Sequence, residues 1–233
     1  MRISILSDIH SNYEALVKAL SLADQLRTDE IYCLGDIVGY GGSPNECVHL
    51  IQKRASKCVI GNHDLAAVDT SHARCFTKHG TVAAEWTHKI LTKENLDYLS
   101  SLPYTSELEL LTLVHANPAK PQDWGYISSL EDALPQFAHF KTPLCFIGHS
   151  HIPFVCGEDL KTLYFKKDLR FIINVGSVGQ PRDGNPQLSF GILDTETRTY
   201  ENIRSDYDVA SAAQTIIDHG LPRFLADRLF LGV

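Results

Sequence analysis

The sequence predicts an α/β fold built on a parallel sheet with crossover helices. Short apolar runs that resemble buried strands alternate with helical patterns through residue 61, which is the order typical of parallel strands joined by helices. The chain has 233 residues, of which 44% are hydrophobic, so it can bury a sizeable core. We expect one domain that spans residues 1–233.

Six apolar runs have the length of buried strands, at residues 3–6, 31–34, 57–60, 110–114, 144–147 and 171–175. Between the first two runs, an apolar stripe with a 3.6-residue period predicts a helix over residues 13–26, with Asn12 as its N-cap. Ser43 as a cap and Pro44 at the first helical position predict a second helix over residues 44–54.

Residues 64–103 interrupt the alternation of strand and helix. Helical patterns recur near residues 80–91 and 93–101, the second preceded by Thr92, and no strand pattern separates them. We therefore expect an inserted helical cap over approximately residues 65–103, between the third and fourth core strands.

The last third of the chain changes to short runs separated by turns, at residues 152–156, 162–166, 170–175, 188–193 and 197–203. These strands would form a second sheet or extend the first. A helix at about residues 207–218 follows, stopped by Gly220 and restarted at Pro222.

Charge and composition narrow the possible partners. The chain has 21 basic and 28 acidic residues and a net charge of −7, so a surface that binds a nucleic-acid polymer is not expected. The six cysteines lack CxxC spacing, which fits a reducing compartment better than a disulfide or zinc-knuckle framework. No secretory signal or run of ~20 apolar residues is present. We expect a cytoplasmic protein without a membrane partner; its oligomeric state does not follow from the sequence.

Residues with metal-ligand chemistry occur in a few short stretches, and several of these follow a strand-like run directly. The stretches are Asp8-Ile9-His10, Gly35-Asp36, Gly61-Asn62-His63-Asp64, Val114-His115-Ala116 and Gly148-His149-Ser150-His151. Open α/β sheets place ligands outside the carboxyl ends of their strands. Each stretch alone has an ordinary structural explanation, such as a helix cap at Asp8 or a turn at Asn62. Together they predict a metalloenzyme.

In this order the motifs resemble the calcineurin-like metallophosphoesterase superfamily. The resemblance implies an α/β fold with two mixed β-sheets packed as a sandwich and flanked by helices. It also implies two divalent metal ions. The first would be bound by Asp8, His10, Asp36 and His151, and the second by Asp36, Asn62, His115 and His149. Asp36 would bridge the two ions, and the mixture of nitrogen and oxygen ligands suits Mn, Fe, Co, Ni or Zn.

The expected chemistry is hydrolysis of a phosphate ester or anhydride by a hydroxide that bridges the two metals. His63, beside Asn62, is expected to be a catalytic residue that does not bind metal. It would donate a proton or hydrogen bond to the leaving oxygen, or steady a non-bridging oxygen. Asp64 is one candidate for orienting its ring. His72 and His79 remain open, because the cap can face the metals.

Two further features bear on the substrate. Residues 174–184 (NVGSVGQPRDG) resemble the bacterial subgroup related to diadenosine tetraphosphate hydrolases. The protein Ser/Thr phosphatase branch carries an acidic residue and an arginine shortly after its Gly-Asp, whereas residues 37–41 here read IVGYG. That departure disfavours a phosphoprotein substrate.

Three residues are candidates for binding the substrate. Arg182 can clamp a phosphate, or it is an exposed turn arginine. Trp124 and Tyr126 can stack a base, or they pin their loop to the core. We expect a small phosphate ester, an anhydride or a nucleotide, with dinucleoside polyphosphates included. The alternatives are a cyclic-nucleotide or other phosphodiesterase, and a non-catalytic binding or regulatory relative.

Overall fold

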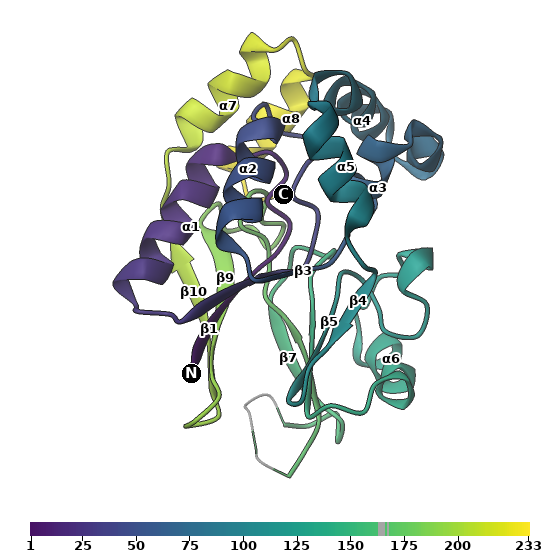
Figure 1. The fold of residues 1–233 in the computed structure, drawn as a ribbon, viewed down its shortest axis with the longest axis vertical. Coiled ribbons are helices and arrows are strands. Elements are labelled where there is room, and N and C mark those ends of the chain that lie inside the picture. The colour runs from purple at the N-terminus through teal and green to yellow at the C-terminus, as the bar shows by residue number, and fades with distance from the viewer. Residues whose placement is uncertain (163–165, 167) are drawn as a thin grey trace.

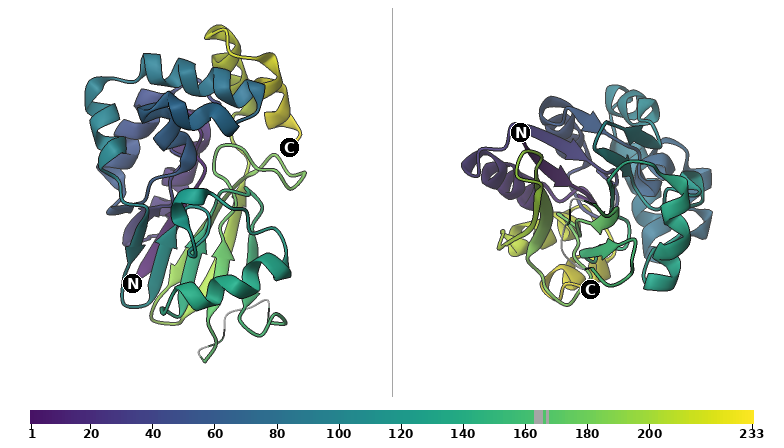
Figure 2. Two further views of the ribbon diagram at one scale, coloured as in Figure 1. Left: turned by 90° about the vertical axis from the view of Figure 1, so that its right-hand side faces the viewer. Right: turned by 90° about the horizontal axis from the view of Figure 1, so that it is seen from below.

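Two mixed β-sheets pack face to face, and helices cover their outer sides (Figures 1 and 2). The structure, a computed structural model, describes residues 1–162, 166 and 168–233. Within these residues each sheet has five strands, in the orders β10-β9-β1-β2-β3 and β4-β5-β6-β8-β7. The predicted α/β sandwich with flanking helices is confirmed.

The first sheet joins the two ends of the chain. Its strands are β1 (Arg2–Leu6), β2 (Glu30–Cys33), β3 (Lys57–Cys58), β9 (Leu188–Asp194) and β10 (Thr199–Ser205). The strands β1, β2 and β3 are parallel, as predicted, with Ile5 opposite Tyr32. Strand β9 pairs antiparallel with β1 and with β10. The late strands β9 and β10 therefore extend the first sheet.

The second sheet has a parallel centre and antiparallel edges. Its strands are β4 (Thr105–Glu107), β5 (Leu111–Val114), β6 (Leu144–Ile147), β7 (Phe154–Gly157) and β8 (Phe171–Asn174). The strands β5, β6 and β8 run parallel, whereas β4 and β7 pair antiparallel with β5 and β8. The short edge strand β4 was not predicted, because Thr-Ser-Glu has no apolar side chain. The strand expected over residues 162–166 falls largely on residues 163–165, outside the described residues.

The two helices nearest the amino end form the crossovers of the first sheet. Helix α1 (Tyr13–Gln25) begins at Asn12, whose side chain accepts a hydrogen bond from the main-chain N–H of Ala15. Helix α2 (Pro44–Arg54) begins as predicted, but the Ser43 side chain makes no capping hydrogen bond there. Both helices bury apolar residues against the first sheet, with Leu16 and Ile51 in the same core cluster.

The other helices gather mainly at one end of the sandwich, where Figures 1 and 2 place α3–α5 beside α7 and α8. The helices between β3 and β4 are α3 (Asn62–Val68), η1 (Thr70–Cys75), α4 (Lys78–Ile90) and α5 (Lys93–Ser101). Those at the carboxyl end are α7 (Val209–Asp218), α8 (Arg223–Asp227) and η4 (Arg228–Phe230). The elements η2 (Pro121–Asp123), α6 (Leu130–Ala133) and η3 (Leu134–His139) lie between β5 and β6.

A second core lies between the two sheets. Ile5 and Leu34 from the first sheet pack with Phe146 and Ile173 from the second. This packing sets the carboxyl ends of β1, β2, β5 and β6 relative to one another. Every predicted metal ligand follows a strand of one sheet or the other. Among the described residues, no helix is long and apolar enough to cross a membrane.

Candidate metal centre and cleft

The strand ends bring the predicted ligands of both sheets to one place. Asp8 and His10 follow β1, Asp36 follows β2, and His115 follows β5 directly. His149 and His151 follow β6, while Asn62 begins α3 just after β3. All seven side chains are buried. The seven predicted ligands, which span 144 positions of the sequence, therefore share one buried cluster.

Three groups within this cluster have ligand atoms within 4.8 Å of one another. They are Asp8, His10 and His151; His10, Asp36 and His63; and Asp36, His115 and His149. The first and third groups fall within the two ligand sets expected from the sequence. Asp36 Oδ2 lies 3.6 Å from His10 Nε2 and 3.3 Å from His115 Nε2. Its carboxylate therefore stands between the two halves of the cluster.

The main chain around the cluster is strained. Five of the seven predicted ligands have the positive φ that side chains other than glycine rarely adopt. They are Asp8 (53°), His10 (50°), Asp36 (51°), His149 (65°) and His151 (61°). Such conformations cost about 1–3 kcal/mol each and concentrate at functional sites. Packing of the sandwich therefore stabilises backbone conformations that are unfavourable locally and that place these side chains together.

At two glycines next to the carboxylates, the carboxylate groups occupy the space that a side chain would need. A Cβ at Gly61 would lie 2.1 Å from Asp36 Oδ1, and a Cβ at Gly148 would lie 2.3 Å from Asp8 Oδ2. Neither distance is compatible with a side chain. The glycines of the Gly-Asn-His-Asp and Gly-His-Ser-His motifs thus allow two loops to approach the two carboxylates.

Main-chain carbonyls determine which nitrogen of three imidazoles carries hydrogen. The Nδ1 atoms lie 3.1 Å from Val38 O in His10, 2.8 Å from Leu34 O in His115 and 2.5 Å from Gln180 O in His151. Since a carbonyl oxygen only accepts, each Nδ1 must be the donor. In the neutral ring, Nε2 is then an unprotonated acceptor, as in imidazoles that bind metals.

These acceptor atoms point at other acceptors. His10 Nε2 lies 3.1 Å from His151 Nε2, and the unprotonated form of His115 Nε2 would likewise face Asn62 Oδ1 at 3.2 Å. Lone pairs at such distances repel unless a cation or proton lies between them. His149 Nε2 is buried and has no hydrogen-bond partner among the described residues. The donor set therefore fits divalent cations.

The charges of the cluster favour the same interpretation. Burial raises the pKa of a carboxyl group, but the neighbouring His151 and His115 outweigh this and lower the pKa of Asp8. His115 and His63 likewise hold the pKa of Asp36 well below its usual value. Burial opposes a charge on His115, yet Asp36 and Asp8 raise its pKa to about 10. The two carboxylates thus attract positive charge to the point where His115 Nε2 faces them.

Burial favours the neutral form of the remaining imidazoles of the cluster. Burial is the main cause that lowers the pKa of His10, of His151 and of His149, the last to about 3. Neutral rings with unprotonated Nε2 atoms are the form that coordinates a metal.

His63 lies at the edge of the cluster. Its ring contacts those of Tyr40 and Phe76, both at 4.4 Å between centroids, and its main-chain N–H donates to Asp36 Oδ1 at 2.8 Å. Burial lowers its pKa to about 4. Asp64 does not orient the ring, because its carboxylate accepts from the main-chain N–H groups of Val38 and Gly61. The two aromatic rings hold His63 instead.

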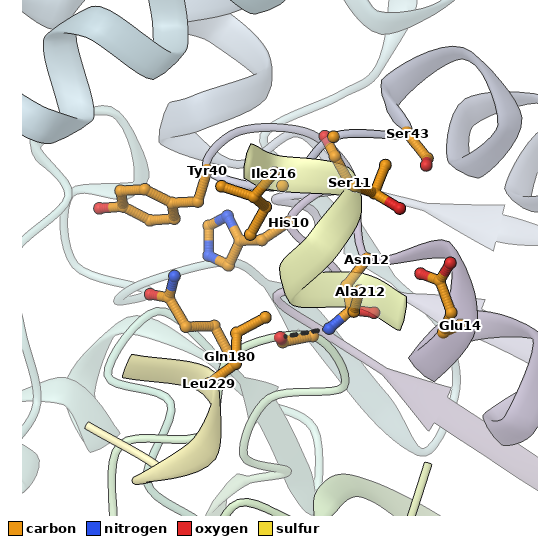
Figure 3. Close-up of a pocket in the computed structure, with 14 residues that line it drawn as sticks. His10, Ser11, Asn12, Glu14, Tyr40, Ser43, Gln180, Ala212, Ile216 and Leu229 are labelled. Atoms are coloured by element: carbon orange, nitrogen blue, oxygen red, sulfur yellow. Dashed lines mark hydrogen bonds between the residues drawn. The ribbon is translucent and has the colours of Figure 1, made fainter. Parts of the chain in front are cut away.

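The segment at residues 174–184 is tied to the loop after β1. Ser177 Oγ donates to Asp8 O at 2.7 Å, and Asn12 Nδ2 donates to Gly179 O at 2.8 Å. The second bond is the dashed line in Figure 3, which also shows His10 between Tyr40 and Gln180. By this attachment the segment carries the Gln180 carbonyl to His151 and Arg182 to the neighbourhood of Tyr40.

A cleft with a volume of about 420 Å³ opens beside the cluster. Its lining combines the helices between β3 and β4, several loops and the carboxyl end of the chain: Tyr40, Asn62, His63, Cys75, Phe76, Thr77, His79, Tyr126, Arg182, Phe224 and Arg228. Among the predicted substrate residues, Arg182 and Tyr126 line this cleft, and the Tyr126 ring stacks on His149 at 4.1 Å. Trp124 packs against His115 at 5.9 Å and Tyr104 at 5.8 Å.

Several residues that line the cleft were not predicted from the sequence. Tyr40 closely follows the Gly-Asp motif in the sequence, and this position could have indicated a residue near the site. Phe76, Phe224 and Arg228 offered none, because they are an aromatic residue in a cap and two residues near the end of the chain. Of the two histidines left open, His79 lines the cleft, whereas His72 is exposed beside Asp69.

Comparisons with known proteins agree with this geometry. Residues 1–198 match the model of the calcineurin-like phosphoesterase superfamily domain. The chain is 41% identical over 240 residues to a Methanocaldococcus jannaschii protein named "Uncharacterized protein MJ0912", and the match covers 99% of this chain and 98% of that protein. A metallophosphoesterase structure from Sphaerobacter thermophilus has a TM-score of 0.90 at 39% identity and covers 100% of this chain and 99% of its own.

A more distant structure shares the fold. It is described as that of "a putative diadenosine tetraphosphatase", with a TM-score of 0.55 at 18% identity over 88% of this chain and 94% of its own. At this identity the likeness concerns the fold alone.

Proposed function

Because the chain belongs to the calcineurin-like phosphoesterase superfamily and is a metal-dependent phosphoesterase, we propose that it hydrolyses small phosphate esters, anhydrides or nucleotides with two bound divalent ions. One observation carries the proposal. The Nε2 atoms of His10 and His151 face each other at 3.1 Å, while their Nδ1 atoms donate to main-chain carbonyls. Such a pair is stable when a cation lies against both lone pairs.

Each ion would have four protein ligands. Those of the first are Asp8, His10, Asp36 and His151, and those of the second are Asp36, Asn62, His115 and His149. Bound divalent ions supply Lewis acidity, which lowers the pKa of water and stabilises charge on a phosphoryl group. The chain contributes two ionised carboxylates, which would neutralise half of the charge of two divalent cations, and imidazoles whose orientation the main chain fixes.

His63 would act on the substrate rather than on the metals. It lines the cleft beside Asn62, and burial keeps its ring neutral at pH 7 with a pKa of about 4. A neutral imidazole still donates one N–H hydrogen bond. We assign it to the leaving oxygen or to a non-bridging oxygen of the phosphoryl group.

The cleft supports a small substrate that carries an aromatic or apolar group. Tyr126 and Phe224 are both largely exposed at its edge, and a nucleobase can stack on either ring. We therefore propose dinucleoside polyphosphates as the more specific substrate class. Trp124 would either contact a base or support the ring of His115. Arg182 would bind a phosphate oxygen.

A substrate panel tests the proposal. Metal-stripped protein reconstituted with Mn²⁺, Co²⁺ or Ni²⁺ is assayed on p-nitrophenyl phosphate, bis-p-nitrophenyl phosphate and diadenosine tetraphosphate. We expect metal-dependent hydrolysis of the monoester or of the dinucleotide. Turnover of the diester alone would reassign the chain to the phosphodiesterases. No turnover with any metal would overturn the proposed function.

A further inference from the structure

Two arginines at the cleft have no Asp or Glu partner among the described residues, in contrast to four other arginines of the chain. Arg182 comes from the loop after β8, and Arg228 begins η4. Four arginines elsewhere form ion pairs with carboxylates, namely Arg54, Arg170, Arg204 and Arg223. In the described part of the chain, no side-chain carboxylate pairs with Arg182 or Arg228.

The contacts of the two guanidinium groups leave donors unused. Arg182 donates through Nε and Nη2 to Gln180 Oε1, at 3.3 and 2.9 Å. Arg228 donates through Nε to the main-chain oxygen of Val233, the last residue of the sequence. The side chain of Arg182 also forms a hydrogen bond with the side chain of Tyr40, and among the described residues the Nη1 and Nη2 groups of Arg228 have no hydrogen-bond acceptor. Each guanidinium has a fork of donors that matches the oxygens of a phosphate.

Both arginines lie beside one aromatic ring. Their Cζ atoms are 5.8 Å (Arg182) and 5.9 Å (Arg228) from the centroid of Tyr40. Burial, with the positive charge of Arg182, lowers the pKa of Arg228 to about 10. Two cations held this close repel each other, and a bound anion would relieve the repulsion.

Tyr40 lies between this pair of arginines and the candidate metal centre. Its ring lies 4.8 Å from that of His10 and 4.4 Å from that of His63. The arginines are thus one aromatic ring away from the place where the reacting phosphoryl group would bind. The family match ends at residue 198, so Arg228 and Phe224 reach the cleft from a segment that the matched region does not include.

We propose that Arg182 and Arg228 form a subsite for a second phosphate group of the substrate, next to the group that is hydrolysed. The inference rests on the proposed function and specifies its substrate class: compounds with two or more phosphates close together, such as nucleoside polyphosphates. Monophosphate esters would occupy the metal centre and leave this subsite without a ligand.

The first test measures binding without metals. Inorganic pyrophosphate and orthophosphate are titrated into the metal-stripped chain by calorimetry. Arg228→Ala and Arg182→Ala should each weaken pyrophosphate binding about 10- to 100-fold, the range of a charged hydrogen-bond pair. Arg223→Ala is the matched control, because Arg223 is on the adjoining helix, exposed and paired with Asp227. Equal pyrophosphate affinity in the Arg228→Ala and Arg223→Ala variants would overturn the subsite.

The second test compares substrates in the manganese-loaded enzyme. Arg228→Ala should lower kcat/KM for diadenosine tetraphosphate at least tenfold more than for p-nitrophenyl phosphate, and Arg228→Lys should recover part of the loss. Equal losses on both substrates would show a structural role and overturn the inference. If the wild type hydrolyses neither substrate while pyrophosphate binding still depends on both arginines, the proposed function fails and the anion site stands.

Discussion

Replacing His63 by alanine distinguishes two roles that its position allows. One ring nitrogen lies within 4.8 Å of ligand atoms of His10 and Asp36, close enough for a third imidazole on the first metal. The ring also lines the cleft, where a substrate would meet it. We expect the His63→Ala variant to keep both metals and to lose rate.

The expected loss of rate follows from the hydrogen bond that is removed. A positioned proton or hydrogen-bond donor contributes about 10²–10⁴-fold to the rate, which is about 2.7–5.4 kcal/mol in activation free energy. Removing the buried ring from between Tyr40 and Phe76 also leaves a cavity, with a cost in folding stability of about 2–4 kcal/mol. At about 2–4 °C per kcal/mol for a chain of this size, Tm should fall by roughly 4–16 °C. The protein remains folded at 25 °C if its stability is in the usual range of about 5–15 kcal/mol.

The assay combines metal content, turnover and thermal unfolding. Metal-reconstituted wild type, His63→Ala and His72→Ala are compared on p-nitrophenyl phosphate at 25 °C. His72 is the matched control, since its side chain is 48% exposed and its ion partner is Asp69. Loss of one metal per chain in the His63→Ala variant would make His63 a ligand. An unchanged kcat would refute the assigned catalytic role.

Three further predictions follow from the site. Asp36→Asn keeps the shape of the side chain but removes the charge between the two halves of the cluster, so metal content by mass spectrometry and kcat should fall together; retention of both metals would contradict the bridging position. Since the pKa of His115 is about 10 in the metal-free chain, a metal must displace its proton, and apparent metal affinity should rise by up to about tenfold per pH unit between pH 7 and 9; a flat calorimetric profile would exclude this displacement. Trp124→Ala and Tyr126→Ala should lower kcat/KM for diadenosine tetraphosphate by about 5- to 150-fold if their rings stack a base, and equal losses on p-nitrophenyl phosphate would identify the altered ring as a structural support.

Strand ends and helix boundaries that depend on the local sequence were predicted well. Apolar runs followed by Asp, Asn or His located the ends of β1, β2, β5 and β6, because side chains at the ends of buried strands are set by the strand itself. The boundaries of α2 agree with those expected from Pro44 and the apolar spacing. The positions of all seven predicted ligands in one cluster follow from the parallel order of the strands.

Features that depend on distant contacts were not predicted. The edge strand β4 has a polar sequence and pairs only because β5 lies beside it. The role of Asp64 as an acceptor for Val38 and Gly61 depends on how two loops meet. Arg228 reaches the cleft through packing of the last helices. Local periodicity and motif spacing contain no information on such contacts.

The most direct measurement is anomalous diffraction from crystals of the manganese-reconstituted protein. We expect two anomalous peaks about 3.5–4 Å apart, both in contact with the Asp36 carboxylate. One peak should lie against His10 and His151 and the other against His115 and His149. A single peak, no peak, or a pair bound elsewhere would contradict the assignment of this cluster as a dinuclear metal centre.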